Sequence, residues 1–241
     1  MLLWVGSVRH TGRSANTATI LGGGEIALSI GLIECYCAIQ VVPARLCDAR
    51  YYIYRQSIQM TSAPARQHVE SFPPQVGAGC VLLILGTVPS VRSLELRQSY
   101  GHPHNLFWTF MGEMFGAAPQ LPYAQRIARL HLHGIGIWDV LEHCERSGSL
   151  DSAIVPGTEV ANDIPRLLDL QPTIGAIALN GGKAQQAFRR HVLPRLTADM
   201  RARITLFDLP STSPANASMP RATKRERWQA LHTWLVEHAH A

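Results

Sequence analysis

Two loop-like stretches each follow a short apolar run, and this arrangement constrains the fold more than any other feature. Residues 86–90 (Gly-Thr-Val-Pro-Ser) follow the run at 81–85, and residues 209–216 (Leu-Pro-Ser-Thr-Ser-Pro-Ala-Asn) follow the run at 204–207. Short apolar runs bounded by Gly, Pro and Ser are typical of buried strands. Loops that leave the carboxyl ends of parallel strands form the ligand crevice of an open α/β sheet. We therefore expect these two loops to lie side by side.

Strand and helix signals alternate through the last two-thirds of the sequence. Strands are expected at 80–85, 134–141, 173–179 and 203–207, and helices at 105–115, 124–132, 164–170, 183–192 and 223–238. Alternation of this kind favours a parallel sheet covered by helices on both faces. We therefore predict an α/β fold, a three-layer α/β/α sandwich with a central, mostly parallel four-stranded sheet.

The first 59 residues differ from the rest, with five arginines, no lysine and a run of three glycines at 22–24. Residues 26–42 are mostly apolar, but Glu34 in their middle argues against a membrane span. We expect residues 1–59 to be an N-terminal extension that is disordered or not translated, with Met60 as an alternative start. Residues 60–79 are expected to be a linker, and residues 80–241 the functional domain.

Charge and cysteine content narrow the partners. The net charge is +5, and of the 22 basic residues only Lys183 and Lys224 are lysine. Arginine suits phosphate recognition, although the base composition of a genome can produce the same bias. The five cysteines, Cys35, Cys37, Cys47, Cys80 and Cys144, form no metal-ligand pattern. We expect no metal, no iron–sulfur cluster and no membrane partner, and a reducing cytoplasmic location.

A dense aromatic block follows the first loop: residues 100–108 read Tyr-Gly-His-Pro-His-Asn-Leu-Phe-Trp. The two loops and this block together resemble the uracil-DNA glycosylase superfamily, and most strongly its hypoxanthine (deoxyinosine) DNA glycosylase branch. Mismatch-specific uracil glycosylases are near relatives. The block fits the family pattern aromatic–small–His-Pro-x-Asn-x-Phe-Trp at every fixed position. The resemblance begins near Cys80.

The resemblance implies that a target base leaves the DNA stack and enters a pocket, where its bond to deoxyribose is hydrolysed without a cofactor. Asn105 would be the catalytic amide, which positions water or contacts the base. Tyr100 would stack on the base, and Gly86, Thr87 and Val88 would line its pocket. Asn105 has a second interpretation as a helix N-cap, and the two roles are compatible.

The same resemblance assigns DNA contacts. The second loop would insert into the duplex and pinch its phosphates, and basic residues at the start of the last helix would hold the backbone beside it. A solvated helix face is the alternative interpretation of those basic residues. The candidate DNA-binding residues are Pro89, Ser90, Ser211, Thr212, Ser213, Asn216, Arg221 and Lys224.

Two positions depart from the uracil-cleaving relatives. Val88 stands where many of them carry Asn or Asp, although the hypoxanthine branch also lacks a polar residue there. Leu209 stands where most members carry a His that stabilises charge on the base. Asp139 and Asp151 receive no catalytic role and are interpreted as buried caps. The segment 180–183 (Asn-Gly-Gly-Lys) is interpreted mainly as structural.

We therefore expect a monomeric, monofunctional glycosylase that acts on double-stranded DNA containing deaminated bases, hypoxanthine first and uracil or xanthine second. No lysine lies within the two loops, so strand cleavage through a Schiff base is not expected. Two alternatives stay open, a uracil or mismatch-specific glycosylase and a non-catalytic nucleic-acid-binding module. A small-molecule hydrolase using Ser211 or Ser213 is disfavoured, because no Gly-x-Ser-x-Gly elbow is present.

Overall fold

The computed structural model describes residues 17–21, 25–30, 33–35 and 66–238. The chain divides into two compact units, Met1–Gln59 and Met60–Ala241. In the first, β1 (Thr17–Leu21), β2 (Glu25–Ile30) and β3 (Ile33–Cys35) form an antiparallel sheet in that order. The sequence patterns do not predict these strands. Most of the expected extension, with Met60, lies outside the described residues, so its dispensability stays a prediction.

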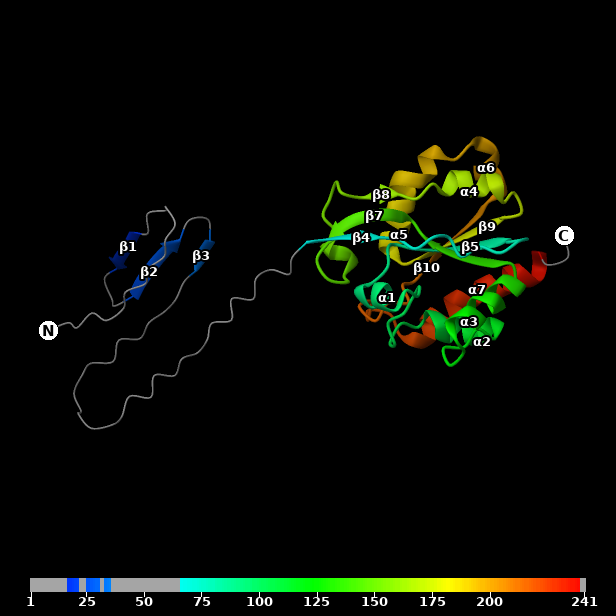
Figure 1. Ribbon diagram of the computed structural model, residues 1–241, viewed down its shortest axis with the longest axis horizontal. Coiled ribbons are helices and arrows are strands. Elements are labelled where there is room, and N and C mark those ends of the chain that lie inside the picture. Colours follow the sequence, from blue (N-terminus) through cyan, green and yellow to red (C-terminus); the bar gives the residue numbers. More distant parts are fainter. Residues whose placement is uncertain (1–16, 22–24, 31–32, 36–65, 239–241) are drawn as a thin grey trace. The chain divides into compact units, whose positions relative to one another are not determined.

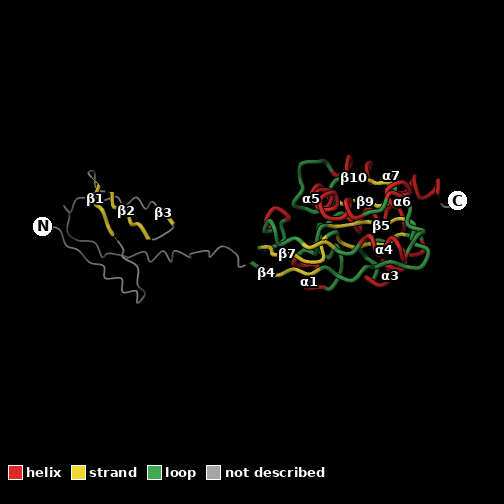
Figure 2. Tube along the Cα trace, turned by 90° about the horizontal axis from the view of Figure 1, so that it is seen from above, coloured by secondary structure: helices red, strands yellow, loops and turns green. Residues whose placement is uncertain are grey.

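The second unit is built on a four-stranded parallel sheet, as the sequence predicts. Its strands are β5 (Leu82–Gly86), β6 (Ile135–Asp139), β9 (Ala176–Asn180) and β10 (Thr205–Leu209), in the order β10-β9-β5-β6. The strands β10, β9 and β5 follow one another in the view from above (Figure 2). The chain steps from β5 to β6 on one side and then crosses to β9 on the other. Such a reversal opens a crevice at the carboxyl ends of the strands.

Helices cover both faces of this sheet, because alternate residues of each strand point to opposite faces. Leu82 and Ile84 pack with α2 (Phe107–Phe115), α3 (Tyr123–Leu132) and α7 (Arg221–His238). Leu83 and Leu85 pack with α4 (Ile164–Leu170), α5 (Gly182–Ala187) and α6 (Ala198–Arg203). The two helix layers lie on opposite sides of the strands in Figure 1. The predicted three-layer sandwich is confirmed.

A second, antiparallel sheet corrects the expected linker. β4 (Gln67–Glu70), β7 (Leu141–Arg146) and β8 (Val160–Ala161) pair in the order β4-β7-β8. The Trp138 indole N–H also donates to the Phe72 carbonyl at 2.9 Å. Residues 67–79 therefore belong to the folded unit and are not a plain linker. The strand β4 was missed because it carries a single buried side chain, Val69.

Short helical turns complete the unit. These are α1 (Val91–Leu96), η1 (Asp151–Ala153), η2 (Phe188–Val192) and η3 (Leu193–Arg195). The helix expected over 183–192 is α5 continued by the single π-helical turn η2. Within the described part of the chain, no helix has the length and apolar character needed to span a bilayer.

Candidate active site

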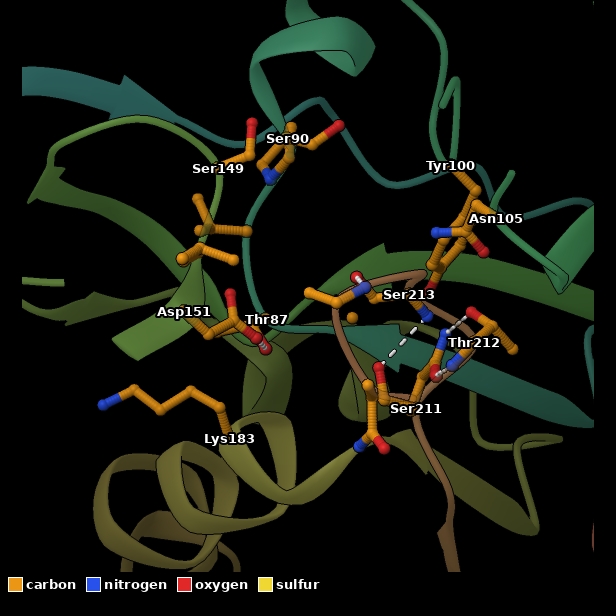
Figure 3. A pocket seen from close by; sticks show the side chains of 18 of the residues that line it. Thr87, Ser90, Tyr100, Asn105, Ser149, Asp151, Lys183, Ser211, Thr212 and Ser213 are labelled. Carbon is orange, nitrogen blue, oxygen red and sulfur yellow. Dashed lines mark hydrogen bonds between the residues drawn. The ribbon is translucent and has the colours of Figure 1, made fainter. Parts of the chain in front are cut away.

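A cavity of about 610 Å³ opens at the carboxyl edge of the central sheet, where the last residues of three strands, Gly86, Asp139 and Asn180, reach its lining. Eleven of the predicted site residues lie on this cavity: Gly86, Thr87, Val88, Pro89, Ser90, Tyr100, Asn105, Ser211, Thr212, Ser213 and Asn216. Figure 3 shows the two loops and the aromatic block facing one another across it. Arg221 and Lys224 are not among its lining residues. The sequence thus located the cavity from its loops.

The side chains of Asp151 and Arg146 hold the first loop, residues 86–90, in place. Thr87 Oγ1 donates a hydrogen bond to Asp151 Oδ2 at 2.9 Å. Arg146, fully buried on β7, donates from Nη2 to the Pro89 carbonyl at 2.6 Å. Ser90 Oγ accepts from the backbone N–H three residues later at 3.2 Å and so caps α1. The loop is therefore preorganised, and the Ser90 hydroxyl is already engaged.

Tyr100 is fixed in a backbone conformation that non-glycine residues seldom adopt. Its φ is 56°, in the left-handed region that costs energy for a bulky side chain. Two hydrogen bonds fix the backbone of the preceding residue, Ser99. Its N–H donates to Tyr123 Oη at 3.1 Å, and its carbonyl accepts from Trp108 Nε1 at 3.0 Å. The Tyr100 ring stacks on Phe107 at 3.8 Å. A ligand in the cavity can therefore stack only on the other face of the ring.

Asn105 uses one half of its carboxamide for structure. Its Oδ1 accepts from the Phe107 N–H, the first residue of α2, at 3.0 Å. The N-cap position itself is Leu106, and Asn105 holds the first N–H of the helix from the residue before it, so the N-cap interpretation is one residue off. The Asn105 NH₂ group has no hydrogen-bond partner among the described residues, and Figure 3 shows it beside Tyr100 and turned toward the cavity. The group that Asn105 offers to a ligand is a donor.

The second loop is tied to both neighbours through Thr212, which is 1% exposed. Asn180 Oδ1 accepts from the Thr212 N–H at 3.0 Å, and Asn180 Nδ2 donates to Thr212 Oγ1 at 2.9 Å. The Thr212 carbonyl accepts from the Leu106 N–H at 3.0 Å. This one residue joins the end of β9, the second loop and the aromatic block. Both polar atoms of the Asn180 side chain are spent on this link, so its structural interpretation fits.

Lys224 does not lie where a DNA contact requires it. It is 2% exposed, and its ammonium group donates to the carbonyls of Ser211 and Asn216 at 2.8 and 2.5 Å. Burial lowers the pKa of this lysine. The Trp228 indole N–H holds the Pro210 carbonyl at 3.0 Å from the same helix. Lys224 is an internal anchor of the second loop, and its expected role at phosphates is not supported by this position.

Two carboxyl groups interpreted from the sequence only as buried caps, Asp139 and Asp151, lie in the cavity lining. Asp151 is paired with Thr87, and its Oδ1 lies 3.9 Å from Nη1 of Arg146. Asp139 has no side-chain hydrogen-bond partner among the described residues. Burial, with the negative charge of Asp151, raises the pKa of the Asp139 carboxyl to about 7, although Arg146 acts in the opposite direction. The sequence does contain a signal for Asp139, because it is the polar residue that ends an otherwise apolar strand.

Comparisons with known proteins agree with this geometry. No protein-family profile matches the chain. A hypoxanthine DNA glycosylase of Methanosarcina acetivorans is 33% identical over 161 residues, which are 66% of this chain and 95% of that protein. A hypoxanthine DNA glycosylase of Methanosarcina barkeri is 34% identical over 116 residues, 48% of this chain and 72% of that protein.

A solved structure is also similar. The solution NMR structure of a candidate uracil DNA glycosylase from Methanosarcina acetivorans superposes with a TM-score of 0.59 at 30% identity, and the match covers 71% of this chain and all of that chain. The chain belongs to the hypoxanthine DNA glycosylase family of the uracil-DNA glycosylase superfamily. The resemblance in the two loops and the aromatic block is thereby confirmed.

For a member of this family, the two departures from uracil-cleaving relatives have a clear structural setting. Val88 is 8% exposed and forms an apolar part of the cavity wall. Leu209 is 4% exposed and packs in the core beneath the cavity with Ala178 and Trp228. Neither side chain can orient water or donate to a base. Hydrogen bonds to water and to the base in this glycosylase site therefore come from other residues of the lining.

The cations around the site are mostly paired. Arg221 and Arg225 are exposed on α7, and both lie within 3.5 Å of Glu113 carboxylate oxygens. Lys183 reaches the cavity lining but pairs with Glu159 at 2.6 Å. Figure 3 shows its ammonium directed away from Tyr100. Arg221 thus stays a candidate for DNA contact beside the second loop, and Lys183 is a weak candidate for a nucleophile.

Proposed function

We propose that this chain removes hypoxanthine from double-stranded DNA by hydrolysing the bond between the base and deoxyribose, which leaves an abasic site. The proposal is carried by the free NH₂ group of Asn105, held in the cavity beside Tyr100. It is supported by family membership, since the curated relatives are named hypoxanthine DNA glycosylases. Uracil and xanthine are proposed as weaker substrates.

The geometry supports a division of labour. The flipped base enters the cavity and stacks against the open face of Tyr100, as bases do on aromatic rings. As the bond to C1′ breaks, its electron pair moves onto the base and positive charge develops on the sugar. The Asn105 NH₂ group stabilises the charge on the base, because a donor held in place gains strength in the transition state. Water adds to C1′ and loses a proton, and the base takes up a proton.

Lyase chemistry is not part of this proposal. Formation of a Schiff base needs an amine with a free lone pair. Lys183 lines the cavity, but its ammonium is paired with Glu159, and Lys224 donates to two carbonyls. We therefore propose a monofunctional glycosylase that needs no cofactor or metal. We also propose that it acts as a monomer in the reducing cytoplasm, where the buried cysteines Cys80 and Cys144 stay free thiols.

DNA contacts are proposed for the rim of the cavity. The hydroxyls and backbone of Ser211 and Ser213 lie on a loop that Lys224 and Thr212 hold rigid, which lowers the entropy lost on binding. Pro89, Ser90 and Asn216 belong to the same lining. Arg221 would hold the backbone beside them. Short hydroxyls, backbone N–H groups and arginine are common partners of phosphate oxygens.

A cleavage assay tests the proposal. Labelled duplexes carrying one inosine, uracil or xanthine are incubated with the full chain and then treated with alkali, which breaks the strand at abasic sites. We expect hypoxanthine to be released fastest, from the duplex that carries inosine. Release of uracil from G·U far faster than hypoxanthine would favour the uracil or mismatch-specific alternative. Tight binding with no release from any duplex would favour the non-catalytic binding module.

A further inference from the structure

We propose that Asp139 is a specificity-determining residue, whose carboxylate accepts a hydrogen bond from the ring N–H of the flipped base while Asn105 donates to the adjacent carbonyl. The inference rests on the proposed function and adds the group that distinguishes a deaminated base from its amino parent. The ligand class is a base with neighbouring N–H and C=O groups, as in hypoxanthine.

The position of Asp139 follows from the sheet. It ends β6, and Gly86 is its register partner at the end of β5. A Cβ built on Gly86 would lie 2.4 Å from Asp139 Oδ1 and 3.1 Å from Tyr100 Oη. The missing side chain of Gly86 therefore makes the room in which these two polar groups converge. They meet at the strand ends, which form the floor of the cavity.

Of the two acids in the cavity lining, Asp139 is the one whose carboxylate is free to bind a ligand. Asp151, the other acid of the lining, accepts from Thr87 and lies near Arg146. The Asp139 backbone carbonyl accepts from Asn162 Nδ2 at 2.9 Å, but its carboxylate has no hydrogen-bond partner among the described residues. Tyr100 Oη is buried and makes no well-directed hydrogen bond among the described residues, although the nearby Asn180 side chain opposes the rise in its pKa. Buried polar groups are normally paired, so unpaired ones in a cavity point to a ligand that completes them.

The chemistry of the base edge fits this pair. Hypoxanthine presents a donor at N1 and an acceptor at the C6 carbonyl, which match a carboxylate and an amide NH₂ respectively. Adenine presents the reverse, an acceptor at N1 and a donor at the exocyclic amine. The Asp139 carboxylate would then face an acceptor and the Asn105 NH₂ group a donor. Neither group could form a hydrogen bond to compensate for the loss of its water. A polar site rejects such a mismatched edge far more strongly than an apolar pocket does.

A ratio of two substrates tests the assignment. Single-turnover release is measured from duplexes carrying deoxyinosine or deoxynebularine, whose purine base lacks both the N1–H and the carbonyl. The wild-type chain should prefer inosine, and Asp139→Ala should reduce that preference roughly tenfold to a hundredfold. Asp139→Asn keeps the shape of the side chain and should reduce it as well, because a carboxamide can turn its NH₂ toward N1 of nebularine.

Glu142→Gln is the matched control. It removes one carboxylate three residues further along the chain, from an exposed side chain outside the cavity, and should leave the ratio unchanged. Melting temperatures are measured for all variants. If folded Asp139 variants lose both rates by one common factor, or neither rate, Asp139 does not read the base edge. A common loss is what a general base for water or a purely structural residue would give.

The pH dependence of the inosine preference provides a second test of the assignment. The pKa of Asp139 lies near 7, with Asp151 and Arg146 as the charged groups that face it and Tyr100 kept neutral by a raised pKa. As the pH falls through 7, the carboxyl gains a proton, becomes a weaker acceptor for the N1–H of hypoxanthine and can donate its own O–H to N1 of nebularine. The inosine preference of the wild-type chain should therefore shrink toward pH 5, whereas that of Asp139→Ala should not change. A preference equally dependent on pH in both proteins would contradict the proposal.

The two proposals fail in different ways. If the wild-type chain releases no hypoxanthine, the proposed function is wrong, whatever the Asp139 variants do. If the wild-type chain releases hypoxanthine and the variants keep its preference over nebularine, only the assignment of Asp139 is wrong.

Discussion

The carboxamide of Asn105 carries two different groups, and the protein itself uses only one of them. Its oxygen caps α2 through the Phe107 N–H, and its NH₂ group lies in the cavity. Replacement by alanine would remove both groups at once, so loss of activity alone would not separate capping from catalysis. Aspartate retains the capping oxygen and replaces the NH₂ group with a second oxygen.

We expect Asn105→Asp to keep the melting temperature of the wild-type chain and to lose about 10²–10³-fold in the rate of hypoxanthine release, because a transition-state donor is gone. Asn105→Ala should lose a similar amount of activity and, in addition, about 1 kcal/mol of stability with the cap. Single-turnover cleavage and thermal melting measure the two effects. His104→Ala, an exposed neighbour outside the cavity lining, is the control. Near-normal cleavage by a folded Asn105→Asp protein would remove Asn105 from the catalytic role.

At the scale of elements, the second loop is rigid because α7 holds it from inside. Lys224 and Trp228 lie one turn apart on the buried face of this helix and donate to three carbonyls of the loop. A helix that packs on the sheet thereby sets the shape of the loop that meets DNA. The anchoring predicts effects that differ from those of a phosphate contact.

Lys224→Met should lower stability by about 1–3 kcal/mol, because two partly buried carbonyls lose their donor while the apolar stem is retained. DNA binding should weaken with no change in its salt dependence, since no phosphate contact is lost. Arg227→Met removes one positive charge from the exposed face of the same helix and should not affect stability. Affinity titrations at several salt concentrations provide the measurement. A salt slope reduced by about one in Lys224→Met would instead indicate a direct phosphate contact.

At the scale of the whole molecule, the starting point of the functional unit can be tested by shortening the chain. A protein that begins at Met60 should fold and release hypoxanthine at the rate of the full chain, because every residue of the cavity lies beyond it. A protein that begins at Cys80 should be less stable, since it lacks β4, which pairs with β7, and the Phe72 carbonyl that binds Trp138. Melting curves and the inosine assay compare the three lengths. An aggregated or inactive Met60 protein would show that the first unit contributes to folding or binding.

The sequence predicts the central sheet and most of its helices because their apolar periodicity is strong. It does not predict β4 and β7, whose short polar sequences bury few apolar side chains and are held by pairing with each other. The cavity was predicted from its loops. The setting of Asp139 was not, because it depends on a neighbouring strand. Lys224 stands in a basic run, but it shares the helical spacing of Trp228 and Leu231, and that spacing was the signal of burial.

The close approach of Gly86 and Asp139 has a consequence for how such enzymes diverge. A side chain at position 86 and a carboxylate at position 139 would occupy the same space, since even a methyl group at 86 would lie 2.4 Å from Asp139 Oδ1. A larger residue at position 86 would therefore force the Asp139 carboxylate to turn away from its place on the cavity floor, so a change at one position favours a change at the other. Related enzymes should therefore differ at positions 86 and 139 together. Such paired replacements in diverged sequences would mark the points at which the preferred base changed.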